Sequence, residues 1–118
     1  MPESSSPPDV VFEGNSRAII KKFPREVREN FGGELQRVQN GQLPLDSAPM
    51  APTLRGVFEL RDEDKDFWYR VFYYTQDGMV YVLHCFKKKT NTTTQGDIEI
   101  GRKRLSDLKE RLRKTKKR

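Results

Sequence analysis

The chain has 118 residues, a formal net charge of +6 and one cysteine, Cys85. This length suffices for one domain, and a single cysteine excludes an intramolecular disulfide framework and a cysteine-based zinc cluster. No stretch reaches the roughly 18 apolar residues of a membrane span and residues 1–9 lack the features of a secretory signal, so we expect a cytoplasmic protein with no membrane partner.

The N-terminal part is predicted to contain a tail, a short strand and two helices. Residues 1–8 are rich in serine and proline and are expected to be a disordered tail, and the domain follows over residues 9–112. A strand over residues 9–12 and a short helix over residues 17–23 are expected next. A second helix is predicted by apolar residues spaced four, four and three apart, namely Val27, Phe31, Leu35 and Val38.

Two glycines interrupt the pattern of this second helix, and a proline-rich segment follows it. Gly32 and Gly33 favour a kink or a close packing contact, because glycine is unfavourable inside a helix. Residues 42–56 contain three prolines and no periodicity. We therefore expect a long loop there.

Three strands are predicted in the middle of the sequence. Residues 57–61 alternate between apolar and charged side chains, and residues 67–75 are rich in aromatic residues on both faces. Asp77-Gly78 is typical of a tight hairpin turn, and residues 79–86 have apolar residues on both faces, as a central strand should. The three strands should form an antiparallel meander.

The last predicted element is a helix over residues 98–112, whose leucines recur three and four residues apart. Residues 113–118 form a basic tail, expected to attract RNA nonspecifically or to be a frayed helix end. Together these elements predict an α+β domain with an antiparallel sheet, two N-terminal helices and a C-terminal helix, all helices lying on one face.

The positive charge is concentrated in the second half of the chain. Residues 53–118 contain 17 basic and 10 acidic residues, against 6 and 7 in residues 1–52. A polyanion such as RNA is therefore the first partner to consider. In the meander, Arg61 should lie on the face away from the helices. Arg70 lies between aromatic residues and is either a rim residue or part of a groove for an anion.

Several kinds of catalytic site are not indicated by the sequence. One histidine, no glycine-rich phosphate loop and no cluster of metal-binding carboxylates near the basic strands argue against a hydrolase triad, a nucleotide-binding fold and a two-metal nuclease. No cofactor is expected. Any chemistry on a phosphodiester would then be metal-independent, with a 2′-hydroxyl as the attacking group and arginine or lysine stabilising the charge on phosphorus.

The order of several motifs resembles the phage-derived HigB/RelE-like toxin family of bacterial toxin–antitoxin systems, particularly its Tad-type branch. The motifs are KKFPREVRENFGGELQRVQNG (21–41), LRGVFELR (54–61), FWYRVFYY (67–74), VYVLHCFKKKT (80–90) and DIEIGRKRL (97–105). This resemblance implies a compact microbial-ribonuclease-like fold. It also implies an mRNA endoribonuclease that acts on the ribosome and is restrained by a helix-turn-helix antitoxin.

The resemblance also implies which residues act. Those matching the catalytic cations of the family are Arg61, Arg70, Lys88 and Lys89, and the further RNA-binding residues are Lys87, Tyr74, Arg55 and Thr90. Related toxins have a tyrosine shortly after the basic segment, where this chain has threonines, so the groups that transfer protons are left open. By strand alternation His84 shares a face with Val80 and Val82, which favours a core histidine over a catalytic one.

Two other functions are consistent with the sequence. The chain could be a non-catalytic module that binds RNA or an antitoxin and retains the toxin fold. It could also be an inert phage remnant whose main role is to bind the antitoxin.

Overall fold

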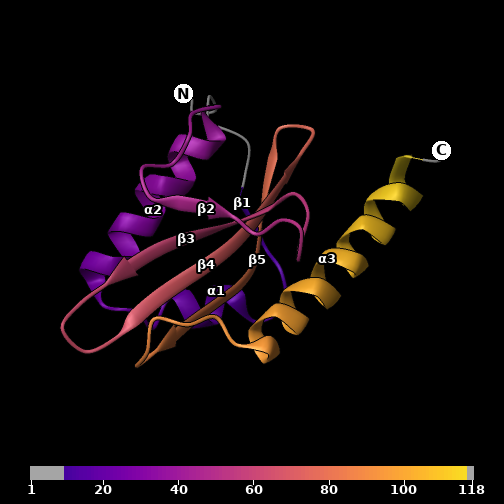
Figure 1. Cartoon of the computed structure of the whole chain (residues 1–118). Coiled ribbons are helices and arrows are strands. Elements are labelled where there is room, and N and C mark those ends of the chain that lie inside the picture. Colours follow the sequence, from indigo (N-terminus) through magenta and orange to yellow (C-terminus); the bar gives the residue numbers. More distant parts are fainter. Residues whose placement is uncertain (1–9, 117–118) are drawn as a thin grey trace.

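The computed structural model describes residues 10–116, so the predicted tail over residues 1–8 and the last two residues of the predicted basic tail lie outside the described part. Its elements are β1 (Val10–Phe12), α1 (Ser16–Ile20), α2 (Arg25–Gln39), β2 (Ser47–Pro49), β3 (Val57–Glu63), β4 (Trp68–Gln76), β5 (Met79–Lys88) and α3 (Gln95–Lys116) (Figure 1). The predicted α+β class is confirmed. Among residues 10–116 no helix is both long and apolar enough to cross a bilayer.

The described strands form one mostly antiparallel sheet in the order β1-β5-β4-β3-β2. β3, β4 and β5 make the predicted meander. The hairpin between β4 and β5 turns at Asp77 and Gly78, which both have positive φ, +53° and +81°. Such a turn matches the twist of the strands it joins. β1 is the exception, because it pairs in parallel with β5.

β2 lies in the segment that the sequence predicted as loop, so that prediction is wrong for Ser47–Pro49. The strand pairs with β3 at the edge of the sheet, where a proline such as Pro49 is tolerated because no further strand needs its N–H. The preceding backbone N–H groups of Leu45 and Asp46 donate to the buried Glu34 carboxylate of α2 at 3.0 and 2.9 Å. These contacts join segments distant in sequence and have no local signal.

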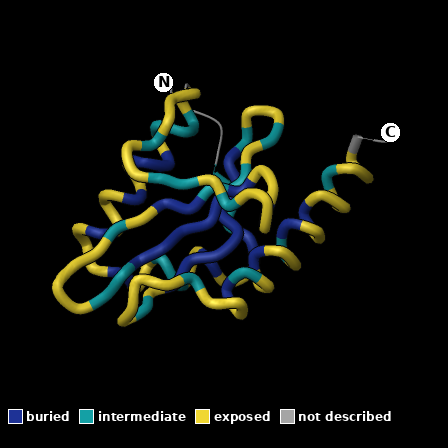
Figure 2. The backbone as a smooth tube through the Cα atoms, in the orientation of Figure 1, coloured by how far each residue is buried: buried dark blue, intermediate teal, exposed yellow. Residues whose placement is uncertain are grey.

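Helices cover both faces of the sheet, so the prediction that all of them share one face is wrong. α1 and α2 pack over a core that includes Phe31 and Val71, whereas α3 packs over a second core that includes Phe72 and Leu108. Figure 1 shows α2 and α3 on opposite sides of the central strands, and Figure 2 shows the buried residues concentrated along those strands. The physical reason is the apolar character of β4 on both faces, which needs a covering layer on each side.

A β-bulge in β5 changes which face His84 occupies. Phe72 pairs with His84 but the next residue, Tyr73, pairs with Val82, so Leu83 is an extra residue in the ladder. His84 therefore lies on the α3 face with Phe72, and not with Val82 as strict alternation predicted. An inserted residue shifts the alternation of every residue after it.

Glycine allows α3 to approach the sheet closely. A Cβ on Gly101 would lie 2.9 Å from a ring atom of Phe72 and 3.3 Å from Leu54. Gly32 and Gly33, where the sequence favoured a kink or a close contact, instead have no atom within 4 Å of such a Cβ, and α2 runs unbroken through both. Close packing thus depends on a glycine in α3 and not on the pair in α2.

We expect Gly101→Ala to lower the free energy of unfolding by about 1–3 kcal/mol, because the added methyl group overpacks a rigid contact. Gly32→Ala is the matched control in open space and should raise it by about 0.5–1 kcal/mol, the helix preference of alanine over glycine. Urea unfolding of the two variants measures both changes. Equal effects of the two substitutions would contradict the close packing of α3.

Candidate functional site

The predicted arginines lie side by side on one surface of the sheet. Arg61 of β3 pairs directly with Arg70 of β4 across the ladder, on the side away from α1 and α2. We call this surface, at the end of the sheet near the β3–β4 turn, the arginine face. Its residues form three rows of cross-strand partners, each with one residue from β3, one from β4 and one from β5. The rows are Glu63, Trp68 and Lys88; Arg61, Arg70 and Phe86; and Glu59, Phe72 and His84.

A buried carboxylate joins the two arginines. Glu59 Oε1 accepts a hydrogen bond from Arg61 Nε at 3.3 Å, and Glu59 Oε2 lies 3.7 Å from Arg70 Nε. Arg70 is only 5% exposed, so it is not a rim residue. Burial lowers the pKa of its guanidinium, and the Glu59 carboxylate opposes that change. Arginine nevertheless stays protonated in proteins, so the face presents two fixed positive charges beside one buried negative charge.

The threonine-rich segment over residues 89–94 covers part of the arginine face. Asn91 Oδ1 accepts a hydrogen bond from Arg70 Nη2, and Thr93 Oγ1 donates to Glu59 Oε2 at 2.7 Å. Thr90 is exposed and shares a hydrogen bond of 2.9 Å with Thr92. The sequence indicated Lys89 and Thr90 of this segment as site residues, but not Asn91 and Thr93, because the contacts of these two are made across the fold.

A hollow of about 410 Å³ opens on the arginine face beside Trp68, and we call it the Trp68 hollow. Its lining residues are Asp46, Arg61, Asp62, Glu63, Trp68, Arg70 and Asn91. The indole is partly exposed, and the Arg70 guanidinium carbon lies 5.7 Å from the centre of its ring system. The sequence indicated a groove of cations and aromatic residues, whereas this hollow also contains three acidic residues and an amide.

The three predicted lysines do not converge on one point. Lys88 is on the arginine face, where its Nζ lies 2.9 Å from Asp97 Oδ2. Lys87 pairs with the buried Tyr69, whose side chain belongs to the core on the other face. The Nζ atoms of Lys87 and Lys89 lie 4.3 and 5.8 Å from the centre of the Phe67 ring. Successive strand residues point to opposite faces, so this divergence follows from the strand itself.

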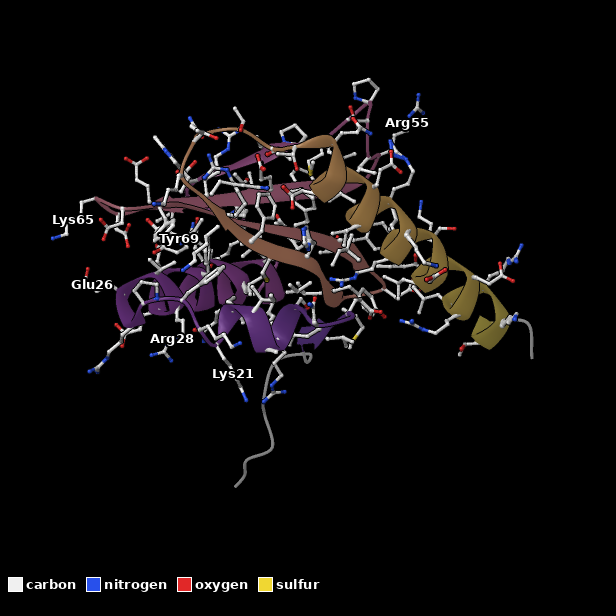
Figure 3. The ribbon with its side chains drawn as sticks, turned by 90° about the horizontal axis from the view of Figure 1, so that it is seen from below. Lys21, Glu26, Arg28, Arg55, Lys65 and Tyr69 are labelled. Atoms are coloured by element: carbon white, nitrogen blue, oxygen red, sulfur yellow. The ribbon has the colours of Figure 1, made fainter. Side chains whose placement is uncertain are left out.

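Two further predicted RNA-binding residues lie away from the arginine face. Tyr74 is four residues along β4 from Arg70, about 13 Å at 3.3 Å per residue. Its hydroxyl donates to Gln76 at 2.8 Å, and Lys109 lies 5.5 Å from its ring centre. Figure 3 shows Arg55 projecting from the end of the molecule opposite to Lys65 in the β3–β4 turn. The structure thus brings neither residue to the arginine pair.

His84 is the member of the arginine face that belongs to a buried polar cluster. Its Nε2 is 2.9 Å from Asp97 Oδ1, and its ring contacts the rings of Phe72 and Phe86, with centroid separations of 5.7 and 5.0 Å. Burial lowers the pKa of His84, so the neutral ring donates through Nε2 to the Asp97 carboxylate. Within residues 10–116 the buried Nδ1 has no hydrogen-bond partner. A buried, neutral histidine of this kind agrees with the core interpretation.

Asp97 ties this cluster to the start of α3. Burial raises the pKa of its carboxyl, but hydrogen bonds from His84, Lys88 and Thr94 outweigh that and leave the pKa of Asp97 lowered. The Thr94 hydroxyl accepts from the Asp97 N–H at 3.2 Å and donates to its carboxylate at 2.8 Å. Threonine followed three residues later by an acid is a helix-start signal, so Asp97 could be found from the sequence as a cap but not as a partner of His84.

In the part of the chain that the structure describes, no three His, Cys, Asp or Glu side chains are grouped so that they could hold a metal ion. Cys85 is buried, as expected for a core residue, and burial raises the pKa of its thiol to about 12.

Comparison with known proteins identifies the family. A search of curated proteins finds no match to the chain. The model of the family described as "Phage derived protein Gp49-like (DUF891)" matches residues 18–106. This range runs from α1 into α3, so it includes β3, β4 and β5 and the whole of the arginine face. The phage-derived origin implied by the sequence motifs agrees with this match. The chain therefore belongs to the phage-derived Gp49-like family.

Proposed function

We propose that this protein is the toxin of a toxin–antitoxin system and cleaves mRNA at the arginine face. The observation that carries the proposal is the direct cross-strand pairing of Arg61 and Arg70 beside the partly exposed indole of Trp68. Phosphates bind guanidinium groups, and unstacked bases bind aromatic rings, so the two together fit single-stranded RNA. Membership of a phage-derived family and the resemblance to HigB/RelE-like toxins support the same function.

The proposed reaction uses the RNA's own 2′-hydroxyl. Its oxygen attacks the neighbouring phosphorus, the bond from phosphorus to the 5′-oxygen breaks, and the products are a 2′,3′-cyclic phosphate and a 5′-hydroxyl. The proton lost by the 2′-hydroxyl is balanced by the proton gained by the 5′-oxygen. Arg61 and Arg70 stabilise the charge that develops on the phosphoryl oxygens, so the reaction needs no metal ion.

The lysines have separate roles in this proposal. Lys88 adds a third positive charge on the arginine face, where Asp97 fixes its position. Lys87 and Lys89 lie beside Phe67 and bind the flanking RNA backbone together with Thr90. Arg55 and Tyr74 would contact RNA only where the RNA strand continues along the sheet, because Tyr74 lies about 13 Å along β4 from Arg70 and Arg55 lies at the end of the molecule opposite to the β3–β4 turn.

The proposed partners follow from the same resemblance. A helix-turn-helix antitoxin would restrain the protein, and the ribosome would present the mRNA to it in the cytoplasm. The excess of positive charge in residues 53–118 supports attraction to ribosomal and messenger RNA.

Binding of RNA without cleavage is the second candidate, and one observation favours it. Glu59 and Asn91 already engage Arg70, and Glu59 also engages Arg61. A phosphate must therefore compete with an internal carboxylate for the two guanidinium groups. A protein that holds RNA through its other cations and never cleaves it would tolerate this arrangement.

One experiment separates the two candidates. Purified protein is incubated with an mRNA, alone and on ribosomes, and new RNA 5′ ends are mapped. We expect new 5′-hydroxyl ends in at least one of the two conditions. RNA that is bound, as judged by gel shift, but acquires no new ends in either condition would contradict the toxin function and support the binding module.

A further inference from the structure

The Trp68 hollow contains acidic groups that phosphate binding does not explain. Glu63, Asp62 and Asp46 line it together with Arg61 and Arg70. Carboxylates repel a phosphate, so a site built only for the RNA backbone would exclude them. The mixed lining indicates that part of the hollow recognises a different chemical group, one that donates hydrogen bonds.

Glu63 is placed to contact a group that stacks on Trp68. The two residues are direct cross-strand partners on the arginine face, which puts their Cβ atoms about 4.5–5.5 Å apart. Both side chains are at least partly exposed. Among residues 10–116 the Glu63 carboxylate has no close ion pair and accepts no hydrogen bond, although its charge acts on the Arg70 guanidinium. A planar ligand lying on the indole would therefore have its edge within reach of a carboxylate that accepts no hydrogen bond from the protein.

Arg70 lies over the same ring. Its guanidinium carbon is 5.7 Å from the ring centre of Trp68, and its register partner is Arg61. A nucleotide whose base stacks on the indole can thus place its phosphate at the arginine pair and its base edge at Glu63. This arrangement fits one nucleotide of a single strand beside the bond that the proposed function cleaves.

The hydrogen-bonding pattern of a carboxylate selects among the four bases. A carboxylate only accepts, through two adjacent oxygens. Guanine presents two adjacent donors, N1–H and the 2-amino group. Adenine and cytosine present an amino group beside an accepting ring nitrogen, and uracil presents one N–H between two carbonyls. In each of these three bases a hydrogen-bond acceptor would therefore face one of the carboxylate oxygens, which is unfavourable.

We infer that the Trp68 hollow is a guanine-specificity site, in which Trp68 stacks on the base and Glu63 accepts hydrogen bonds from its N1–H and 2-amino groups. The inference rests on the proposed function, because it assigns a base preference to the proposed RNA-cleaving surface. Asn91 also lines the hollow, with its amide oxygen held by Arg70. Its amide NH₂ is a donor of the kind that guanine O6 requires.

The test uses RNA that cannot be cleaved through its 2′-hydroxyl. Fluorescently labelled 2′-O-methyl uridine heptamers, with G, A, C or U at the central position, are titrated with the full chain and followed by anisotropy. We expect the G heptamer to bind about tenfold more tightly than the others, which lies within the range for one bidentate base contact. Glu63→Gln should reduce this preference to about twofold or less, because one accepting oxygen becomes a donor.

A matched variant controls for charge. Glu26 is exposed in the first turn of α2, on the opposite face of the sheet, so Glu26→Gln makes the same change in net charge away from the hollow. It should leave the guanine preference unchanged. Trp68→Ala should weaken binding of all four heptamers, because each base stacks on the ring.

Each outcome bears on a different claim. Equal binding of the four heptamers, no binding of any, or a Glu63→Gln variant that keeps the full preference would overturn the inference, whether or not the protein cleaves RNA. A guanine preference that Glu63→Gln removes, in a protein that never generates new RNA ends, would support the inference and contradict the proposed function.

Discussion

Arg61→Ala is expected to lower the rate of RNA cleavage by about 100- to 1,000-fold, the usual cost of removing one preorganised group that stabilises transition-state charge. Arg61 is suited to this test because its side chain is 46% exposed, and its hydrogen bond to Glu59 is 3.3 Å long. Ion pairs with an exposed partner contribute at most about 1 kcal/mol to folding. The variant should therefore stay folded while its activity falls.

The measurement is the initial rate of appearance of new RNA 5′ ends, with thermal unfolding recorded in parallel. Arg25→Ala is the control, because it removes an exposed arginine that also has a carboxylate partner, Glu29, from α2, on the opposite face of the sheet. It should retain the wild-type rate. An Arg61→Ala variant that cleaves as fast as the wild type would remove Arg61 from the catalytic surface.

Arg70→Met is expected to lower the free energy of unfolding by about 3 kcal/mol, the lower end of the range for breaking a buried ion pair, because it leaves the buried Glu59 carboxylate with the half-exposed Arg61 as its remaining cation. The side chains of Arg70 and Glu59 are 6% and 8% exposed, so water cannot replace the lost interaction. Removing both charges in Arg70→Met/Glu59→Gln should restore a large part of the loss, since two buried neutral groups carry a smaller desolvation cost.

Urea unfolding of the wild type, the two single variants and the double variant completes this cycle. Arg61→Ala is the reference for an exposed arginine on the same face and should change the free energy of unfolding by less than about 1 kcal/mol. Additive effects of Arg70→Met and Glu59→Gln would show that the two groups do not interact. Loss of activity in Arg70→Met alone is ambiguous because the variant is destabilised, so the catalytic claim depends on Arg61.

Local patterns predicted most of the elements correctly. The apolar spacing in α2 and α3 and the alternation in β3 identified these elements to within a few residues, because helix and strand periodicities are properties of a short segment. The Asp77-Gly78 turn was also predicted from its residues alone. The antiparallel meander put Arg61 and Arg70 on neighbouring strands, but their direct pairing was not predicted from the sequence.

Features that depend on distant contacts were not predicted. β2 forms because its segment meets Glu34 of α2 and the edge of β3, and the bulge at Leu83 has no turn residue to mark it. The apolar residues on both faces of β4 were recognised, but their consequence, a helix layer on each face, was not drawn. A fully apolar strand requires cover on both sides, and that was the available signal.

The site shows the same division between local and distant information. Glu59 could have been assigned from the sequence, because it lies two residues before Arg61 in a strand and so shares its face. Asn91 and Thr93 could not, because their contacts depend on the path of residues 89–94 across the sheet. Asp46 and Glu63 were not predicted as site residues, because an RNA-binding site was expected to consist of cations and aromatic residues, and this expectation does not select acidic residues.

The central claim is cleavage by the RNA's own 2′-hydroxyl at the arginine face, and a single 2′-deoxynucleotide tests it most directly. Once a cleavage site is mapped in an mRNA, the nucleotide on its 5′ side is replaced by its 2′-deoxy form, and cleavage there is compared with that of the unmodified mRNA and of one modified two nucleotides upstream. We expect cleavage at the mapped bond to be lost with the first substitution and retained with the second. Cleavage of the 2′-deoxy bond at the normal rate would contradict the account.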